Sequence, residues 1–161
     1  MFRHLLVPTD GSELAEPTVA RAVRIAQDMG ARITFFHAQD SPYAHPEVGL
    51  FGEGVVIDPA LNEQFAQAHA AHANQLLAEA KHQAETAGVP ADTLTTINPT
   101  IYEAILTAAS QRGCDLIVMA SHGRRGLAAL LLGSETQRVL THAAIPVLVI
   151  PAPTVSAPPR A

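Results

Sequence analysis

The chain contains no tryptophan, and only 4% of its 161 residues are aromatic. Its core must therefore be built from aliphatic side chains, which are available because 48% of the residues are hydrophobic. That hydrophobic fraction excludes disorder over the whole chain. A core of Val, Ile, Leu and Ala is typical of a parallel sheet covered by helices, and the length is that of one domain.

The chain also has no pair of cysteines for a disulfide, no excess of positive charge and no long apolar run. Cys114 is the one cysteine, so we expect a small packed thiol and a reducing compartment. The formal net charge of −5 argues against electrostatic binding to nucleic acid or to anionic membranes. No run approaches the ~20 apolar residues of a membrane span, and the N-terminal residues lack a signal-peptide pattern. We therefore expect a cytoplasmic protein with no nucleic-acid or membrane partner.

Short apolar runs alternate with stretches of helical periodicity along the chain. The runs predict strands at residues 4–9, 32–38, 93–97, 115–120 and 146–150. The periodic stretches predict helices at residues 13–29, 60–87, 101–111 and 136–142. Ser12 is expected to cap the first helix and Gly30 to end it. This order predicts an α/β fold, with an open five-stranded, mainly parallel sheet and helices on both of its faces.

Two segments have no sustained periodicity. Residues 41–59 are rich in glycine and proline, and we interpret them as a long surface loop of the kind that often covers a site. Residues 151–161 contain four prolines and little that can be buried, so we expect a disordered tail. The sequence therefore predicts a single domain over residues 1–150 followed by this tail.

Two predicted strands lead into residues that suit ligand binding. The first strand continues into residues 8–12, where Asp10 offers a carboxylate. The fourth continues into a glycine-rich stretch that reaches Gly133 and Ser134 at the start of a helix. Ligands of open parallel sheets bind beyond the carboxyl ends of the strands. Both segments are therefore candidates for one binding site.

The glycine-rich stretch has the chemistry of a polyphosphate site. Gly123 and Gly126 allow a backbone to approach a ligand closely, and Arg124 adds positive charge. The helix that follows presents free N–H groups and the positive end of its dipole, which attract anions. The same residues also have an explanation without a ligand, because Ser134 and Gln137 fit a capping box.

Other candidate residues have plain structural explanations as well. Asp10 fits the closure of an Asp-Gly turn, with no ligand involved. His122 is a candidate base, although a histidine beside glycines is more often a hydrogen-bonding loop residue. His69, His72 and Glu79 can share one face of the long helix; metal binding and a solvated polar face both remain open there, and the second is the commoner arrangement.

The spacing of the glycine-rich stretch resembles the signature of the universal stress protein family. That signature reads Gly, two residues, Gly, nine residues, and then Gly followed by Ser or Thr. Gly123, residues 124–132 and the pair Gly133-Ser134 match it. Ala120 stands where the first glycine is expected, so we expect nucleotide binding that is weakened or unaffected by the added methyl group. Residues 8–12 and 144–150 resemble the family's first turn and last strand.

The resemblance implies an ATP site in a Rossmann-like sheet of strand order 3-2-1-4-5. Asp10 would accept hydrogen bonds from the ribose hydroxyls, and Pro8 and Thr9 would line the adenine side. Ala38 would offer its backbone to the adenine edge, and Met119 would pack on the base. The segment that would hold the phosphates includes Ala120, Ser121, His122, Gly123, Arg124, Gly126, Gly133, Ser134, Glu135 and Thr136. Mg²⁺ or Mn²⁺ would be held by the phosphates, with no metal site from the protein alone.

The function that these features favour is a stress-response regulatory module that binds an adenine nucleotide and forms a homodimer. The resemblance implies dimerisation through residues 147–150, an apolar strand expected at a sheet edge. A slow ATPase or phosphoryl-transfer enzyme is an alternative, but the chain lacks the Gly-x-x-x-x-Gly-Lys loop of P-loop enzymes, and we assign no catalytic residue. A family member that dimerises without nucleotide is a second alternative.

Overall fold

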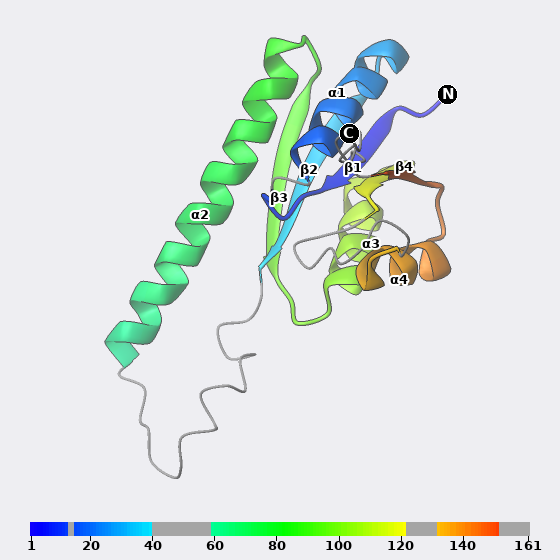
Figure 1. The fold of residues 1–161 in the computed structure, drawn as a ribbon. Helices are drawn as coiled ribbons and strands as arrows, with labels where there is room; N and C mark the ends of the chain where they lie inside the picture. The colour runs from blue at the N-terminus through cyan, green and yellow to red at the C-terminus, as the bar shows by residue number, and fades with distance from the viewer. Residues whose placement is uncertain (13–14, 40–58, 122–131, 152–161) are drawn as a thin grey trace, which may run out of the picture.

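The computed structural model in Figure 1 describes residues 1–12, 15–39, 59–121 and 132–151. The strands are β1 (His4–Pro8), β2 (Arg32–Gln39), β3 (Ala91–Ile97), β4 (Leu116–Ala120) and β5 (Val147–Ile150). The helices are α1 (Glu16–Met29), α2 (Pro59–Thr86), α3 (Ile101–Arg112) and α4 (Ser134–His142). The predicted alternation of strands and helices is therefore confirmed. Residues 41–58 of the loop expected at 41–59, and residues 152–161 of the expected tail, lie outside the described residues, whereas Pro59 is the first residue of α2.

The five strands form one sheet in the order β3-β2-β1-β4-β5, and every neighbouring pair is parallel. This confirms the fold class and the strand order that the sequence led us to expect. The order places β1 at the centre, with β2 and β3 on one side and β4 and β5 on the other. The chain therefore reverses its winding direction between β1 and β4.

Helices cover both faces of this Rossmann-like sheet (Figure 1). Side chains of a strand point alternately to opposite faces, and the core is accordingly divided into two clusters. Leu5 of β1 packs in the cluster with α1 and α2, where Leu77 is buried. Leu6 of β1 packs in the cluster with α3 and α4, where Ile105 and Val139 are buried. Both faces are apolar, which is why the strands read as continuous hydrophobic runs.

The ends of α1 show one correct prediction and one wrong one. Gly30 ends the helix in the left-handed conformation, with φ of 63°, as predicted. Ser12 does not cap it: the N-cap residue is Ala15, with no side-chain cap hydrogen bond. The Ser12 hydroxyl donates instead to Asp10 Oδ1 at 2.7 Å. The nearby carboxylate is the stronger acceptor, so the hydroxyl is used in the turn before the helix.

The capping box that would explain Ser134 and Gln137 without a ligand is not formed. The helix begins at Ser134, so Gly133 is the N-cap residue and no side chain caps it. The Gln137 side chain donates to the backbone carbonyl of Leu132 at 2.9 Å. Ser134 is therefore inside the helix rather than in front of it. None of the helices in the described part of the chain combines the length and the apolar character that a membrane span needs.

Candidate functional site

The pairing between the two central strands is shorter than the pairing on either side. β1 pairs with β4 at Leu5–Leu116 and at Leu6–Ile117. By contrast, β1 pairs with β2 over all five of its residues, and β4 stays paired with β5 as far as Ala120. The carboxyl ends of β1 and β4 therefore continue beyond their shared pairs. This point, where the winding direction reverses, is where open α/β sheets bind ligands.

A tight turn follows β1 on one side of this point. Asp10 Oδ1 accepts a hydrogen bond from the Ser12 backbone N–H at 3.0 Å and one from the Ser12 hydroxyl. Gly11, between them, has a φ of +70°, the left-handed conformation that glycine adopts without strain. The Asp-Gly turn that we gave as a structural explanation is therefore present. It also fixes the direction of the Asp10 carboxylate at the edge of the sheet.

The residue before the turn is held by β2. Thr9 is buried, and its N–H donates to the Phe36 carbonyl at 2.9 Å. The Thr9 carbonyl is 2.8 Å from Nδ1 of His37. This role of His37 is absent from the expectations above, although a histidine near the end of an apolar strand is a usable signal for it. These contacts attach the Asp10 turn to the carboxyl end of β2.

The other side of the site is the junction between β4 and α4. Ala120 is the last residue of β4 and pairs with Ile150, so its backbone is extended, which alanine adopts without strain. The Ser121 N–H donates to the Ile150 carbonyl at 2.8 Å, and the Ser121 carbonyl accepts from Gly133 N–H at 2.8 Å. The Thr136 hydroxyl donates to the Ala120 carbonyl at 3.0 Å. The start of α4 is thus bound directly to the end of β4.

The first turn of α4 is oriented for anion binding. The backbone N–H groups of a helix's first turn have no acceptor within the helix, and they carry the positive end of its dipole. The first backbone bond of α4 is donated by Gln137 to Gly133 at 3.0 Å. The N–H groups of Ser134, Glu135 and Thr136 come before it. Because Gly133 is tied to Ser121, these N–H groups lie at the carboxyl edge of the sheet.

Glu135 connects two helix starts. Its Oε2 accepts a hydrogen bond from the Tyr102 N–H in the first turn of α3, at 2.9 Å. Its Oε1 is 3.3 Å from Nη1 of Arg138, whose guanidinium lies 5.7 Å from the centre of the Tyr102 ring. The sequence analysis assigned Glu135 to the phosphate segment. The contacts show that its carboxylate orients α3 relative to α4.

Two of the residues assigned to the adenine, Ala38 and Met119, lie on one face of the sheet. Met119 is buried in the cluster with α3 and α4, and Ala38 packs against the same cluster. Pro8 is half-buried at the end of β1, between the strands that carry these two residues. All the predicted site residues that the structure describes are at or next to the ends of β1, β2 and β4 or at the start of α4. His122, Gly123, Arg124 and Gly126 lie outside the described residues.

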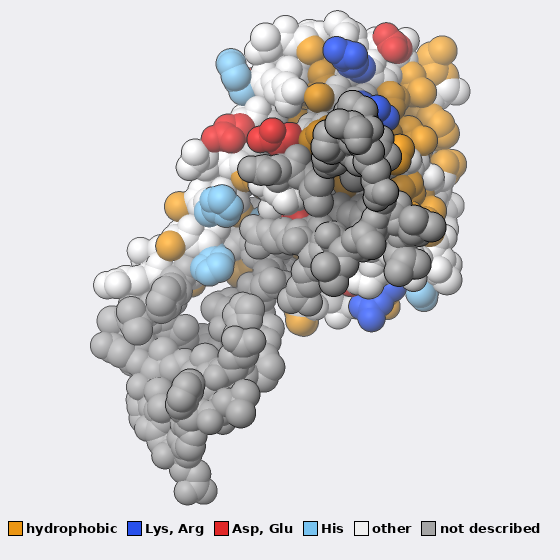
Figure 2. Space-filling view, viewed as in Figure 1, with side chains coloured by type: hydrophobic (Ala, Val, Ile, Leu, Met, Phe, Trp, Pro, Cys, Tyr) orange, Lys and Arg blue, Asp and Glu red, His pale blue; other side chains and the backbone are white. Residues whose placement is uncertain are grey.

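The candidate metal ligands on α2 do not form a cluster. His69, His72 and Glu79 are exposed, and Figure 2 shows histidine side chains spaced along this helix. Glu79 accepts a hydrogen bond from Gln75 at 2.9 Å. Over the described ranges, no group of three or more His, Cys, Asp or Glu side chains is arranged to hold a metal ion. The solvated polar face is therefore the arrangement that the structure supports for α2.

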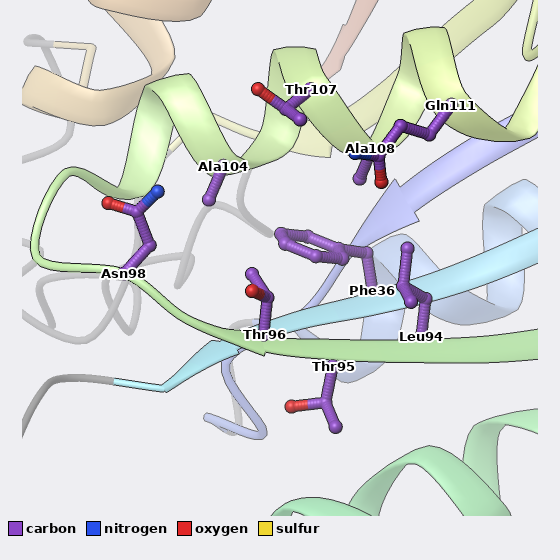
Figure 3. Close-up of a pocket in the computed structure, with 9 residues that line it drawn as sticks. All are labelled: Phe36, Leu94, Thr95, Thr96, Asn98, Ala104, Thr107, Ala108 and Gln111. Carbon is purple, nitrogen blue, oxygen red and sulfur yellow. The ribbon is translucent and has the colours of Figure 1, made fainter.

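A groove of about 150 Å³ lies elsewhere on the molecule, between α3 and the edge strand β3. Phe36 and Leu94 lie at its base, and Asn98 and Gln111 lie toward its two ends (Figure 3). Its lining contains no charged side chain and none of the predicted site residues. The groove therefore lacks the groups that a phosphate needs, and the junction of β1, β4 and α4 remains the candidate site.

Known proteins with similar sequences support the resemblance that the glycine-rich stretch suggested. The chain matches the family model of the universal stress proteins over residues 1–151. It belongs to the universal stress protein family. Universal stress protein MJ0531 of Methanocaldococcus jannaschii is 32% identical over 155 residues, which cover 95% of this chain and 84% of that protein.

Solved structures of universal stress proteins share the fold. The structure of MJ0577 from M. jannaschii has a TM-score of 0.75 and 25% identity, with 93% of this chain and 96% of that one covered. UspA from Lactobacillus plantarum has a TM-score of 0.73 and 28% identity, with 92% of this chain and 97% of that one covered. The likeness of this universal stress protein to its relatives therefore extends from β1 to β5.

Proposed function

We propose that this universal stress protein binds an adenine nucleotide, ATP, between the Asp10 turn and the start of α4. The observation that carries the proposal is the attachment of α4 to β4, through the bonds from Gly133 to Ser121 and from Thr136 to Ala120. It brings an anion-binding helix start to the edge of the strand next to β1. The Asp10 carboxylate follows β1 at that same edge.

Each part of the nucleotide has a matching group at this edge. The Asp10 carboxylate is an acceptor for the ribose hydroxyls, and its Oδ1 is already oriented by Ser12. The N–H groups at the start of α4 suit the phosphates. Ala38, which packs against the cluster that contains Met119, is assigned to offer its backbone edge to the base, with Met119 beneath it. Mg²⁺ or Mn²⁺ would be bound through the phosphate oxygens.

Two solved proteins with this fold contain adenine nucleotides. A universal stress protein in complex with cAMP has a TM-score of 0.65 and 23% identity, with 92% of this chain and 96% of that one covered. The universal stress protein from Archaeoglobus fulgidus in complex with dAMP has a TM-score of 0.61 and 17% identity, with 92% of this chain and 97% of that one covered. These complexes support the class of ligand proposed here, and the choice of ATP rests on the phosphate-binding features of α4.

The proposed role of the bound nucleotide is regulatory. We propose a cytoplasmic homodimer that pairs through β5, a sheet edge on which Leu148 is 38% exposed. An apolar edge strand favours pairing with another chain. Nucleotide binding next to β4 would then affect the dimer interface, because β4 pairs directly with β5.

Titration of ATP against the purified protein tests the site. We expect Asp10→Ala to raise the Kd about tenfold or more, since hydrogen bonds involving a charged group contribute about 1.5–3 kcal/mol. Gly133→Val should also raise the Kd, because a branched side chain keeps the phosphates away from the backbone at the start of α4. Ala120→Gly should leave the Kd unchanged or lower it. Asp28→Ala, which removes an exposed carboxylate from the last turn of α1, is the matched control and should not change the Kd. Equal affinity in all five proteins would overturn the proposed site.

A further inference from the structure

Leu76 of α2 occupies the space in front of the Asp10 turn. A Cβ atom added to Gly11 would stand 3.3 Å from Cγ of Leu76 and closer still to its Cδ1. Gly11 also has a φ of +70°. The backbone conformation favours glycine here, and the Leu76 side chain would have to move to admit any larger residue. The helix and the turn are in direct contact, although they are separated by 64 residues in the sequence.

Leu76 is not needed to attach α2 to the sheet. The helix is held by a row of buried residues, Ala73, Leu77, Ala80 and Ala84, of which Leu77 is 2% exposed. Leu77, Ala80 and Ala84 belong to the core cluster that includes β1 and β2. Leu76 is half-buried and lies outside that cluster. Its large side chain is therefore directed to a different partner, the Gly11 turn.

The contact restricts the turn that carries the Asp10 carboxylate. Within the turn, Asp10 Oδ1 is bonded to Ser12, and Thr9 is held by β2. These bonds set the internal shape of the turn, whereas Leu76 supports it from outside. A glycine at the centre of a turn has more freedom than any other residue. Support from a neighbouring helix is what limits that freedom before a ligand arrives.

We propose that Leu76 is a positioning residue for nucleotide binding: α2 holds the Asp10 turn in the conformation that receives the ribose. This inference rests on the proposed function. A preformed site binds more tightly because less conformational freedom is lost on binding. The position of α2 against the turn then affects the affinity for nucleotide. By thermodynamic reciprocity, bound nucleotide stabilises α2 in that position.

Two neighbouring leucines on one helix provide a matched test by ATP titration, at a temperature well below unfolding. Leu76→Ala should raise the Kd about fivefold or more, with a small change in Tm. Leu77→Ala should lower the Tm strongly, because it opens a cavity in the core, but it should raise the Kd less than Leu76→Ala does, because the contact with the Gly11 turn is kept. Leu76→Met, which preserves the volume, should restore the wild-type Kd. The inference would be overturned if the Kd rose in proportion to the loss of Tm across the three variants. It would also be overturned if Leu76→Ala left the Kd unchanged.

A double-mutant cycle tests the contact without nucleotide. Gly11→Ala should destabilise the fold both by its φ and by collision with Leu76. Leu76→Ala removes the second cause, so the Tm loss from Gly11→Ala should be smaller in the Leu76→Ala background. Strict additivity would show that the contact is absent and would overturn the inference.

The same measurements separate the inference from the proposed function. If the wild-type protein binds ATP and Leu76→Ala binds it equally well, the positioning role fails and the proposed function stands. If the wild-type protein binds no adenine nucleotide, the proposed function fails, and the link between α2 and affinity fails with it.

Discussion

The backbone N–H of Gly133 donates a 2.8 Å hydrogen bond to the carbonyl of Ser121, across the eleven residues from 122 to 132. The bond joins the two ends of the segment that the family signature covers. The Thr136 hydroxyl adds a second link to the same strand through the Ala120 carbonyl. The start of α4 is therefore fixed by residues at the two ends of the signature.

The Thr136 link predicts a loss of stability when the hydroxyl is removed. Thr136 is 3% exposed, and Thr136→Val keeps its shape while it deletes the donor to Ala120. We expect the free energy of unfolding in urea to fall by about 1–2 kcal/mol. Thr141→Val is the control, because that exposed hydroxyl bonds only to the Gln137 carbonyl of its own helix. Its cost should stay within about 0.5 kcal/mol, and equal losses for both variants would argue against the link.

The fold could be predicted from the sequence because its two central strands, β1 and β4, are apolar on both sides. Residues 5–7 and 116–119 are continuous hydrophobic runs, which the two-sided burial of a central parallel strand requires. Gly30 also had an unambiguous role, because a helix that ends in the left-handed conformation strongly favours glycine. The strand order came from the family resemblance, since periodicity carries no information on which strands are neighbours.

The site could be predicted only in part, because several of its contacts depend on tertiary structure. The Ser12 hydroxyl had two possible acceptors, the start of α1 and Asp10, and the choice is decided by the turn geometry. The contact between Gly11 and Leu76 joins segments that the sequence pattern does not relate. The role of Glu135 toward Tyr102 likewise needs the distance between two helix starts, which is visible only in the folded chain.

The proposed dimer predicts that a charge on β5 separates the subunits. Leu148 is 38% exposed on this edge strand, and a lysine there disfavours edge-to-edge pairing. We expect Leu148→Lys to sediment as a monomer at micromolar concentration, where the wild-type protein sediments as a dimer. Ile97→Lys is the matched control, because Ile97 is 62% exposed on β3 at the opposite edge of the sheet. A monomeric wild type, or dissociation by both substitutions, would contradict dimerisation through β5.

Cys114 is predicted to be unreactive in the folded protein. The thiol is buried, and burial raises the pKa of Cys114 to about 11. The thiolate is the reactive form, so at pH 8 only about one thiol in a thousand is ionised. We expect iodoacetamide to label the native protein slowly and the urea-unfolded protein quickly. Since the chain has one cysteine, the labelled mass identifies the site, and equal rates in both states would contradict its burial.

His4 makes the stability of the fold sensitive to mild acid. It lies in β1, 5% exposed, with Nε2 2.8 Å from the Thr34 hydroxyl. Its Nδ1 is buried and has no hydrogen-bond partner among the described residues. Burial, reinforced by the Arg32 charge, lowers the pKa of His4 below 6.5, the ordinary value for histidine. The folded protein therefore holds this imidazole in its neutral form.

The direction of the pH effect follows from the lowered pKa. Well above pH 6.5, the ordinary pKa of histidine, neither the folded nor the unfolded chain protonates His4 appreciably, so its contribution to stability is fully present. As the pH falls through about 6.5, the unfolded chain takes up the proton first, and the free energy of unfolding decreases. The loss continues until the pH reaches the lower pKa of the folded state. The slope for this one proton is at most about 1.4 kcal/mol per pH unit.

A neighbouring carboxylate acts in a separate pH range. Burial favours the neutral form of Asp115, but its hydrogen bonds from the backbone N–H groups of His4 and Arg3 outweigh that effect and lower the pKa of Asp115 below 3.8. Its contribution is therefore present above pH 3.8 and is lost at lower pH. Between pH 7 and pH 5 the Asp115 carboxylate stays ionised, so the change in stability over that range reports on histidine.

Urea unfolding of His4→Gln between pH 7 and pH 5 tests this assignment. The amide can still bond to the Thr34 hydroxyl but does not titrate, so the variant should lose less stability on acidification than the wild-type protein. His142→Gln is the control, because His142 is exposed on α4. The comparison of the two variants shows whether the effect is specific to the buried position. If His4→Gln and the wild-type protein lose stability in parallel over this range, the buried imidazole is not the group that makes the fold acid-sensitive.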